Sequence, residues 1–162
     1  MRVLGKWTLR VAWMAVALAA ASAAAVSAQT FDKKVLSFAA ARKMAAAAQE
    51  AAKAKGVDVV IVVVDDGGYI ILLERMDGAQ VASVNVGIGK ARTAAIYRRP
   101  SKDFEDQIRA GRVAALALAD STPLQGGVPI RLDGKVIGAI GVSGDTPQVD
   151  ETIAIVGANA FK

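Results

Sequence analysis

The sequence predicts an α+β fold in which helices cover a single antiparallel sheet, in the order α-β-β-α-α-β-β-α. Two observations predict it. Pairs of apolar runs flank the turn sequences Asp65-Asp66-Gly67-Gly68 and Asp133-Gly134, which is typical of β-hairpins. Stretches with apolar residues at helical spacing lie before, between and after these hairpins. A parallel sheet would instead need a crossover helix between paired strands.

The first 28 residues have the pattern of a secretory signal peptide. The apolar run 11–26 is shorter than the roughly 20 residues that a membrane-spanning helix needs. It follows three basic residues and ends at a small-residue cleavage motif: Arg2, Lys6, Arg10 and Val26-Ser27-Ala28. We therefore expect residues 29–162 to form one periplasmic or secreted domain, with no stable membrane insertion after cleavage.

The composition of the expected mature chain excludes several functions. Removing residues 1–28 takes away three positive charges and no acids, which lowers the net charge from +5 to +2 and leaves no electrostatic case for binding nucleic acid. The absence of His and Cys excludes Ser-His-Asp and Cys-His catalysis, disulfides, thiolate metal sites and imidazole ligation of haem.

The first half of the domain is predicted as a helix followed by a hairpin. Residues 31–55 carry small apolar residues at helical spacing, and Gly56 suits the position just after the helix. The β-branched run 57–64 predicts a buried strand, and residues 69–73 predict its partner.

Two further helices are predicted in the middle of the chain. Residues 81–97 place Val84, Ile88, Ala91 and Ala95 on one helical face. Ser101 is the expected N-cap of the next helix, which residues 113–119 are expected to continue after Gly111.

The last part of the chain predicts a second hairpin and a closing helix. Residues 128–132 and 136–142 are its strands, and Thr146 and Pro147 have the pattern of a helix start. The expected apolar stripe of this helix is formed by Val149, Ile153, Val156 and Ala160.

Carboxylates and glycines at the expected element edges each allow a functional and a structural interpretation. Asp65-Asp66 and Asp150-Glu151 can share a proton or bind a hard cation, but turns and helix N-termini also favour acids for structural reasons. The glycines at 138, 141 and 144 can admit a ligand or the close packing of a helix on their strand, and we favour packing.

Polar residues of the middle helix and of the loop before the second hairpin form the expected ligand site. Lys90 and Arg92 can hold an anion or be solvated at the surface. Ser121 and Thr122 are hydroxyls in a turn-rich loop, and the backbone at Gly126-Gly127 can approach an anionic group. We expect a pocket between this helix and this loop.

Short motifs along the expected mature chain resemble the GlcG/HbpS family. They follow one another over essentially all of residues 29–162: Val63-Val64-Asp65-Asp66-Gly67-Gly68, Glu74-Arg75-Met76-Asp77-Gly78, Lys90-Ala91-Arg92-Thr93-Ala94, Gly126-Gly127-Val128-Pro129-Ile130, Asp133-Gly134, Gly138-Ala139-Ile140-Gly141-Val142-Ser143-Gly144 and Asp150-Glu151. The resemblance implies a profilin-like fold, related to the C-terminal domain of PduO-type cobalamin adenosyltransferases, and symmetric homo-oligomers. Several members bind haem, and some extracellular members are described as degrading it.

The resemblance implies haem as a ligand, with its propionates held by basic side chains and its iron held weakly by oxygen. One haem-binding member uses a threonine in the loop ahead of its Gly-Gly, which Ser121 or Thr122 matches here. Members that use histidine have no counterpart in this chain. The expected ligand-binding residues are therefore Arg75, Lys90, Arg92, Thr93, Ser121, Thr122, Gly126 and Gly127.

Three functions remain open at this point. The chain can be a haem or tetrapyrrole binder, which we favour. It can be an enzyme that degrades haem or acts on a small organic acid through Asp65 or Asp150. It can also be an oligomeric accessory protein, or a binder of a small anionic ligand without haem chemistry.

Overall fold

The computed structural model describes residues 31–162, so the predicted signal peptide lies outside the described residues. Residues 35–162 form one compact unit with the predicted element order. Its elements are α2 (Phe38–Ala54), β1 (Val60–Asp65), β2 (Ile70–Arg75), α3 (Ser83–Ile96), α4 (Lys102–Arg109), the 3₁₀ helix η1 (Val113–Ala117), β3 (Gly127–Leu132), β4 (Lys135–Ser143) and α5 (Pro147–Asn159). The α+β prediction is confirmed.

The four strands form one antiparallel sheet in the order β2-β1-β4-β3. Both predicted hairpins are present. Asp133 and Gly134 have φ angles of 50° and 75°, a left-handed pair that matches the twist of a two-residue hairpin. The hairpins join through β1 and β4, which pair from Val60 with Ser143 to Asp65 with Gly138.

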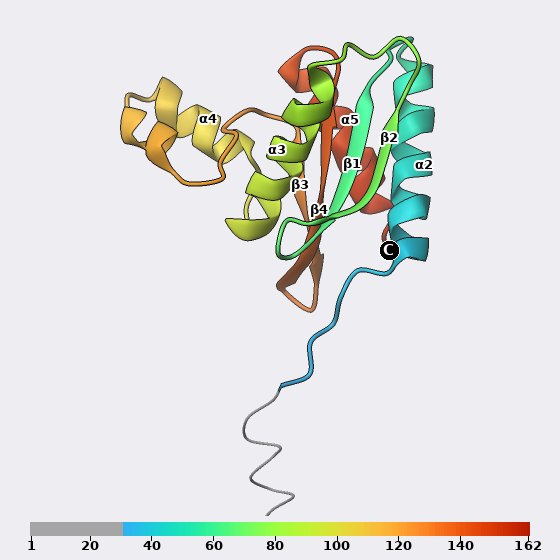
Figure 1. The fold of residues 1–162 in the computed structure, drawn as a ribbon, viewed down its shortest axis with the longest axis horizontal. Coiled ribbons are helices and arrows are strands. Elements are labelled where there is room, and N and C mark those ends of the chain that lie inside the picture. The colour runs from blue at the N-terminus through green and yellow to red at the C-terminus, as the bar shows by residue number, and fades with distance from the viewer. Residues whose placement is uncertain (1–30) are drawn as a thin grey trace, which may run out of the picture. The chain divides into compact units, whose positions relative to one another are not determined.

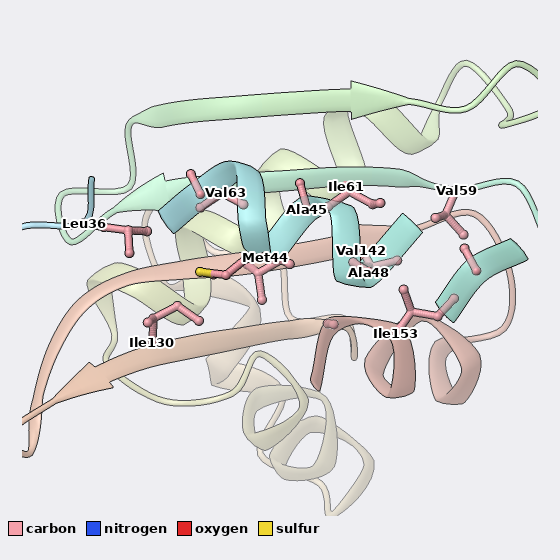
Figure 2. Packing of buried hydrophobic residues seen from close by; sticks show 14 of the residues in the cluster. Leu36, Met44, Ala45, Ala48, Val59, Ile61, Val63, Ile130, Val142 and Ile153 are labelled. Atoms are coloured by element: carbon pink, nitrogen blue, oxygen red, sulfur yellow. The ribbon is translucent and has the colours of Figure 1, made fainter. Parts of the chain in front are cut away.

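Helices α2 and α5 cover one face of the sheet (Figure 1). The main apolar core lies between these helices and the inward residues of β1 and β4 (Figure 2). Ile61 and Val63 face this core, whereas Val60 and Val62 face the opposite side, so every residue from Val59 to Val64 is fully buried. Burial on both faces explains why the run 57–64 is almost continuously apolar.

Helix α3 covers the other face through small side chains, mainly Ala91, Ala94 and Ala95. A Cβ added at Gly141 of β4 would lie 2.5 Å from the Gly87 carbonyl oxygen and 2.6 Å from the Ala91 nitrogen. Gly141 therefore admits the backbone of α3, which confirms the packing interpretation at this position. Gly138 and Gly144 lie instead against the Val64 and Asp58 carbonyls.

The first helix begins later than the sequence predicts. It starts at Phe38 instead of residue 31, because the Ser37 hydroxyl accepts a hydrogen bond from the Ala40 N–H at 3.2 Å and caps the helix there. It ends as predicted, with Gly56 at a φ of 68°.

Two other local predictions are wrong, and a third is correct in position only. Ser101 occupies the N-cap position of α4 as predicted, but its hydroxyl does not bond to the helix, because it accepts from Gly127 N–H and donates to the Leu124 carbonyl. The segment after Gly111 (φ 94°) does not continue α4 but forms the separate η1. Val156 is 41% exposed, and Gly157 takes the buried place on α5 instead.

Residues 102–123, which we call the arm, stand beside the sheet and contain α4 and η1 (Figure 1). The base of the arm is held by Ser101, through the two bonds above and a third from its own N–H to the Gly127 carbonyl. Within residues 31–162, no helix is long and apolar enough to cross a membrane.

Candidate functional site

The end of the arm lies directly along α3. Three contacts hold residues 119–122, two from adjacent residues of α3 and one from Tyr97 at its C-cap. Tyr97 Oη donates to the Ala119 carbonyl at 2.6 Å, Arg92 Nη1 pairs with Asp120 Oδ1 at 3.7 Å, and Thr122 N–H donates to Thr93 Oγ1 at 2.7 Å. The structure thus brings together the predicted Arg92, Thr93 and Thr122 at one side of α3.

The loop packs directly against α3 at two places. Thr122 Oγ1 lies against Gly89, and Gly127 lies against the Lys90 carbonyl, so a Cβ has no room at Gly89 or at Gly127. The pocket that we expected between this helix and this loop stays a prediction.

Lys90 is buried and already paired, which differs from the surface position that we allowed for it. It is 3% exposed, and its Nζ donates to Asp150 Oδ2 at 2.7 Å and to the Val142 carbonyl at 3.1 Å. Asp150 is 1% exposed, and its other oxygen accepts from the Asp145 N–H at 3.0 Å. This pair ties α3 to β4 and α5, and it leaves the ammonium of Lys90 unable to reach an external anion.

Burial raises the pKa of Asp150 above its ordinary value, while the hydrogen bond and the charge of Lys90 act in the opposite direction. Desolvation disfavours the ionised carboxylate, so this group is stable as an anion only because the ammonium lies beside it. Gly126, with φ 124°, lies next to this pair, since a Cβ there would be 3.0 Å from Lys90 Nζ.

Two predicted residues lie away from the contact between α3 and the loop. Arg75 is exposed at the end of β2. Arg92 lies near the other end of that strand, where its Nε donates to the Gly68 carbonyl at 3.4 Å. Asp65 accepts from the N–H groups of Gly67 and Tyr69, both at 2.9 Å, so its carboxylate organises the hairpin turn.

Ser121 is distinctive among the loop hydroxyls. Its Oγ is buried, and it has no hydrogen-bond partner among the described residues. Thr122 Oγ1 faces Gly89, and Thr93 Oγ1 is occupied by the Gly89 carbonyl and the Thr122 N–H. Ser121 and Thr122 as iron ligands therefore stay a prediction that requires the loop to open.

The arm presents an apolar surface beside basic side chains. Val113 and Leu116 are 65% and 64% exposed, and Leu124 at the arm's base is 42% exposed. Tyr97 packs edge-on against the buried Phe104 at a centroid distance of 5.1 Å, and the Arg99 guanidinium lies 4.0 Å from the Phe104 ring centre. Exposed aliphatic side chains, an aromatic stack and arginines together suit a flat apolar ligand that carries anionic groups.

A second candidate surface is a shallow pocket of about 190 Å³ between β3 and the end of α5. Its lining includes Pro129, Ile155 and Phe161. It contains none of the predicted ligand residues, and its volume is below the usual range for small-molecule sites. Among residues 31–162 there is no group of three His, Cys, Asp or Glu side chains placed to hold a metal ion.

Three features of the site had no signal in the sequence. Asp150 looked like an ordinary helix-start acid, because its partner Lys90 is far away in the chain. The Tyr97–Phe104 contact joins two predicted helices across a turn, and hydrophobic periodicity does not reveal such contacts. Gln125 is a third case: it links the arm to α5, since its N–H donates to Glu105 and its side chain to Glu151.

Comparison with known proteins agrees with the fold. The family model described as "Haem degrading protein HbpS-like" matches residues 36–159. The structure resembles that of the Klebsiella pneumoniae protein ORFY (32% identity, TM-score 0.77, 82% of this chain and 94% of that one). It also resembles a complex titled PduOC:Heme (27% identity, TM-score 0.72, 78% of this chain and 95% of that one).

A curated relative matches over a shorter stretch. Protein GlcG of Escherichia coli K12 is 41% identical over 75 residues, which is 46% of this chain and 56% of GlcG. The match thus spans little more than half the length of that relative.

Proposed function

The chain belongs to the HbpS-like family, also described here as GlcG/HbpS, and from that premise we propose that it is an exported haem-binding protein. The observation that carries the proposal is the exposed aliphatic surface of the arm, whose end is in contact with Arg92 of α3 through Asp120. Haem offers a flat apolar face and two anionic propionates, so it needs both kinds of partner. When bound, it would supply a redox-active iron.

The residues fit haem on the arm better than at the buried lysine. Val113 and Leu116 are exposed enough to cover an apolar face. Arg92 and Arg98 are accessible for propionates, whereas Lys90 is committed to Asp150. The chain has no His or Cys, so iron ligation falls to oxygen or thioether groups.

Haemin titration of the purified protein tests this proposal. We expect a Soret band that saturates at a fixed ratio of haemin to protein. Leu116→Glu should weaken binding about tenfold or more, because it places a charge against the apolar face of haem. Ile155→Glu is the matched control: it is also a partly exposed aliphatic residue (44%), but on α5 in the second pocket, and it should bind like the original chain.

The outcomes separate the alternatives. Absence of saturable binding would refute haem binding and favour an oligomeric accessory role. Loss of binding in Ile155→Glu alone would move the ligand to the β3–α5 pocket. Slow loss of the Soret band after a reductant is added would support haem degradation rather than storage or transport.

A small organic acid is the second candidate ligand. It would use the partly exposed guanidinium of Arg92, which Asp120 engages at 3.7 Å. Competition between such an acid and haemin, measured at increasing acid concentration, distinguishes a shared site from separate sites.

A further inference from the structure

On the basis of the proposed haem binding, we propose that Tyr97 supplies the protein ligand to the haem iron through its phenolic oxygen. Proteins bind haem iron mainly through His, Cys, Met or Tyr side chains. This chain has no His and no Cys, and the hydroxyls of Ser121 and Thr122 would need their loop to open, so the choice among the usual ligands lies between its methionines and its two tyrosines.

The methionines of the described residues are not available. Met44 of α2 is fully buried in the core (Figure 2). Met76, which follows β2, is half-buried and packs against the same core. Met1 and Met14 belong to the predicted signal peptide, outside the described residues. Ligation by Met44 would require the core to open, which leaves Tyr69 and Tyr97.

Tyr97 lies where the arm meets α3. It is partly exposed, and its hydroxyl donates to the carbonyl of the exposed Ala119, in the loop that follows η1, at 2.6 Å. Its ring is fixed by the edge-on contact with Phe104, at an interplanar angle of 67°. A fixed ring whose oxygen lies at this loop is a preorganised ligand for a group that lies on the arm.

Two arginines lie beside Tyr97. Arg98 follows it directly and is exposed, and Arg99 stacks on the same Phe104 ring. When the iron–oxygen bond forms, the phenol releases its proton to solvent and its hydrogen bond to Ala119 is lost. Guanidinium groups at this place are suited to pair with the propionates of a haem held by Tyr97.

Tyr69 is the less suitable tyrosine. It is 69% exposed in the β1–β2 turn, where its ring lies over Gly67, and no aromatic contact fixes it. It is therefore the matched control for Tyr97: the substitution of Phe for Tyr is the same, at a surface site outside the arm.

The experiment compares haemin binding by the original chain, Tyr97→Phe and Tyr69→Phe. We expect ferric haem in the original chain to show high-spin absorption and phenolate vibrations in its resonance Raman spectrum. These vibrations should shift when the protein carries ring-deuterated tyrosine. Tyr97→Phe should lose them and bind haemin about tenfold or more weakly, while Tyr69→Phe should keep both properties.

Each other outcome overturns the inference. If the original chain binds haemin without phenolate vibrations, or if Tyr97→Phe keeps them, Tyr97 is not the ligand and the proposed function still stands. If they vanish in Tyr69→Phe instead, the ligand is in the hairpin turn. If the original chain shows no saturable binding, the proposed function fails together with this inference. Because Phe retains the contact with Phe104, circular dichroism of Tyr97→Phe should match the original chain.

Discussion

Replacing Lys90 by Met should destabilise the fold strongly. The substitution keeps the length of the side chain but removes the ammonium, so Asp150 is left 1% exposed with one hydrogen bond, from Asp145. Removing one partner of a buried ion pair costs about 3–5 kcal/mol. That is a large part of the total stability of roughly 5–15 kcal/mol of an ordinary domain.

The double variant Lys90→Met/Asp150→Leu should recover most of this loss. No charge then remains buried, and the residual cost is two hydrogen bonds, from Lys90 to the Val142 carbonyl and from the Asp145 N–H to Asp150, about 1 kcal/mol each. A double-mutant cycle with Asp150→Leu alone gives the coupling energy, which we expect to be favourable by about 2 kcal/mol or more. Urea denaturation followed by circular dichroism measures each free energy of unfolding.

The loss in Lys90→Met should also depend on pH. Burial raises the pKa of Asp150 in the folded protein, and removing Lys90 removes the main opposing influence. A carboxyl group whose pKa is raised on folding stabilises the protein at pH values below its unfolded pKa, and this stabilisation is lost as the pH rises through the folded value. Lys90→Met should therefore lose less stability near pH 5, which is about one unit above the ordinary carboxyl pKa, than near pH 8, which is far above it.

Two results would refute this reasoning. One is a double variant whose loss equals the sum of the two single losses, which would mean that the groups do not interact. The other is a Lys90→Met loss that is the same at both pH values, which would mean that Asp150 does not stay buried. Lys90→Met/Asp150→Asn is the control, because it has no carboxyl at this position to titrate.

The remaining predictions concern packing, export and assembly. Gly141→Ala should cost about 1–3 kcal/mol in urea denaturation, because its Cβ would lie 2.5 Å from the Gly87 oxygen. Gly111→Ala, with open space around it, should cost only the strain of its φ of 94°, about 1 kcal/mol; equal losses would contradict the packing. Mass spectrometry of the exported protein should find a chain that begins at Gln29, and a soluble product with Met1 intact would contradict export. Light scattering at micromolar concentration should give the mass of a dimer or a larger symmetric homo-oligomer, and a monomer mass would contradict assembly.

The sequence predicted the fold well because the fold depends on local patterns. The hairpin turns, the β-branched run of β1 and the alanines of α3 each have a signature within a few residues. The fold implied by the family resemblance agrees with the order of elements that these patterns predict. The start of α2 was less predictable, since Leu36 fits the same helical spacing as the apolar residues of α2, and the Ser37 cap sets the boundary.

The site was harder to predict because it depends on tertiary pairing. Lysine is usually a surface residue, and Lys90 is buried because it pairs with Asp150, 60 positions later in the chain. Ser101 resembled a helix cap, but its hydroxyl accepts a hydrogen bond from the N–H of Gly127, which is distant in the chain. In both cases a polar residue is held inside the fold by a partner that periodicity cannot identify.

The strand order β2-β1-β4-β3 also bears on how the chain folds. Each hairpin closes a short loop, so either one can form early and on its own. The β1–β4 ladder joins residues from opposite halves of the chain, and it completes the surfaces on which α2, α3 and α5 pack. The formation of this central seam should therefore limit the folding rate, and until it forms each half exposes one strand of β-branched side chains to its neighbours in solution.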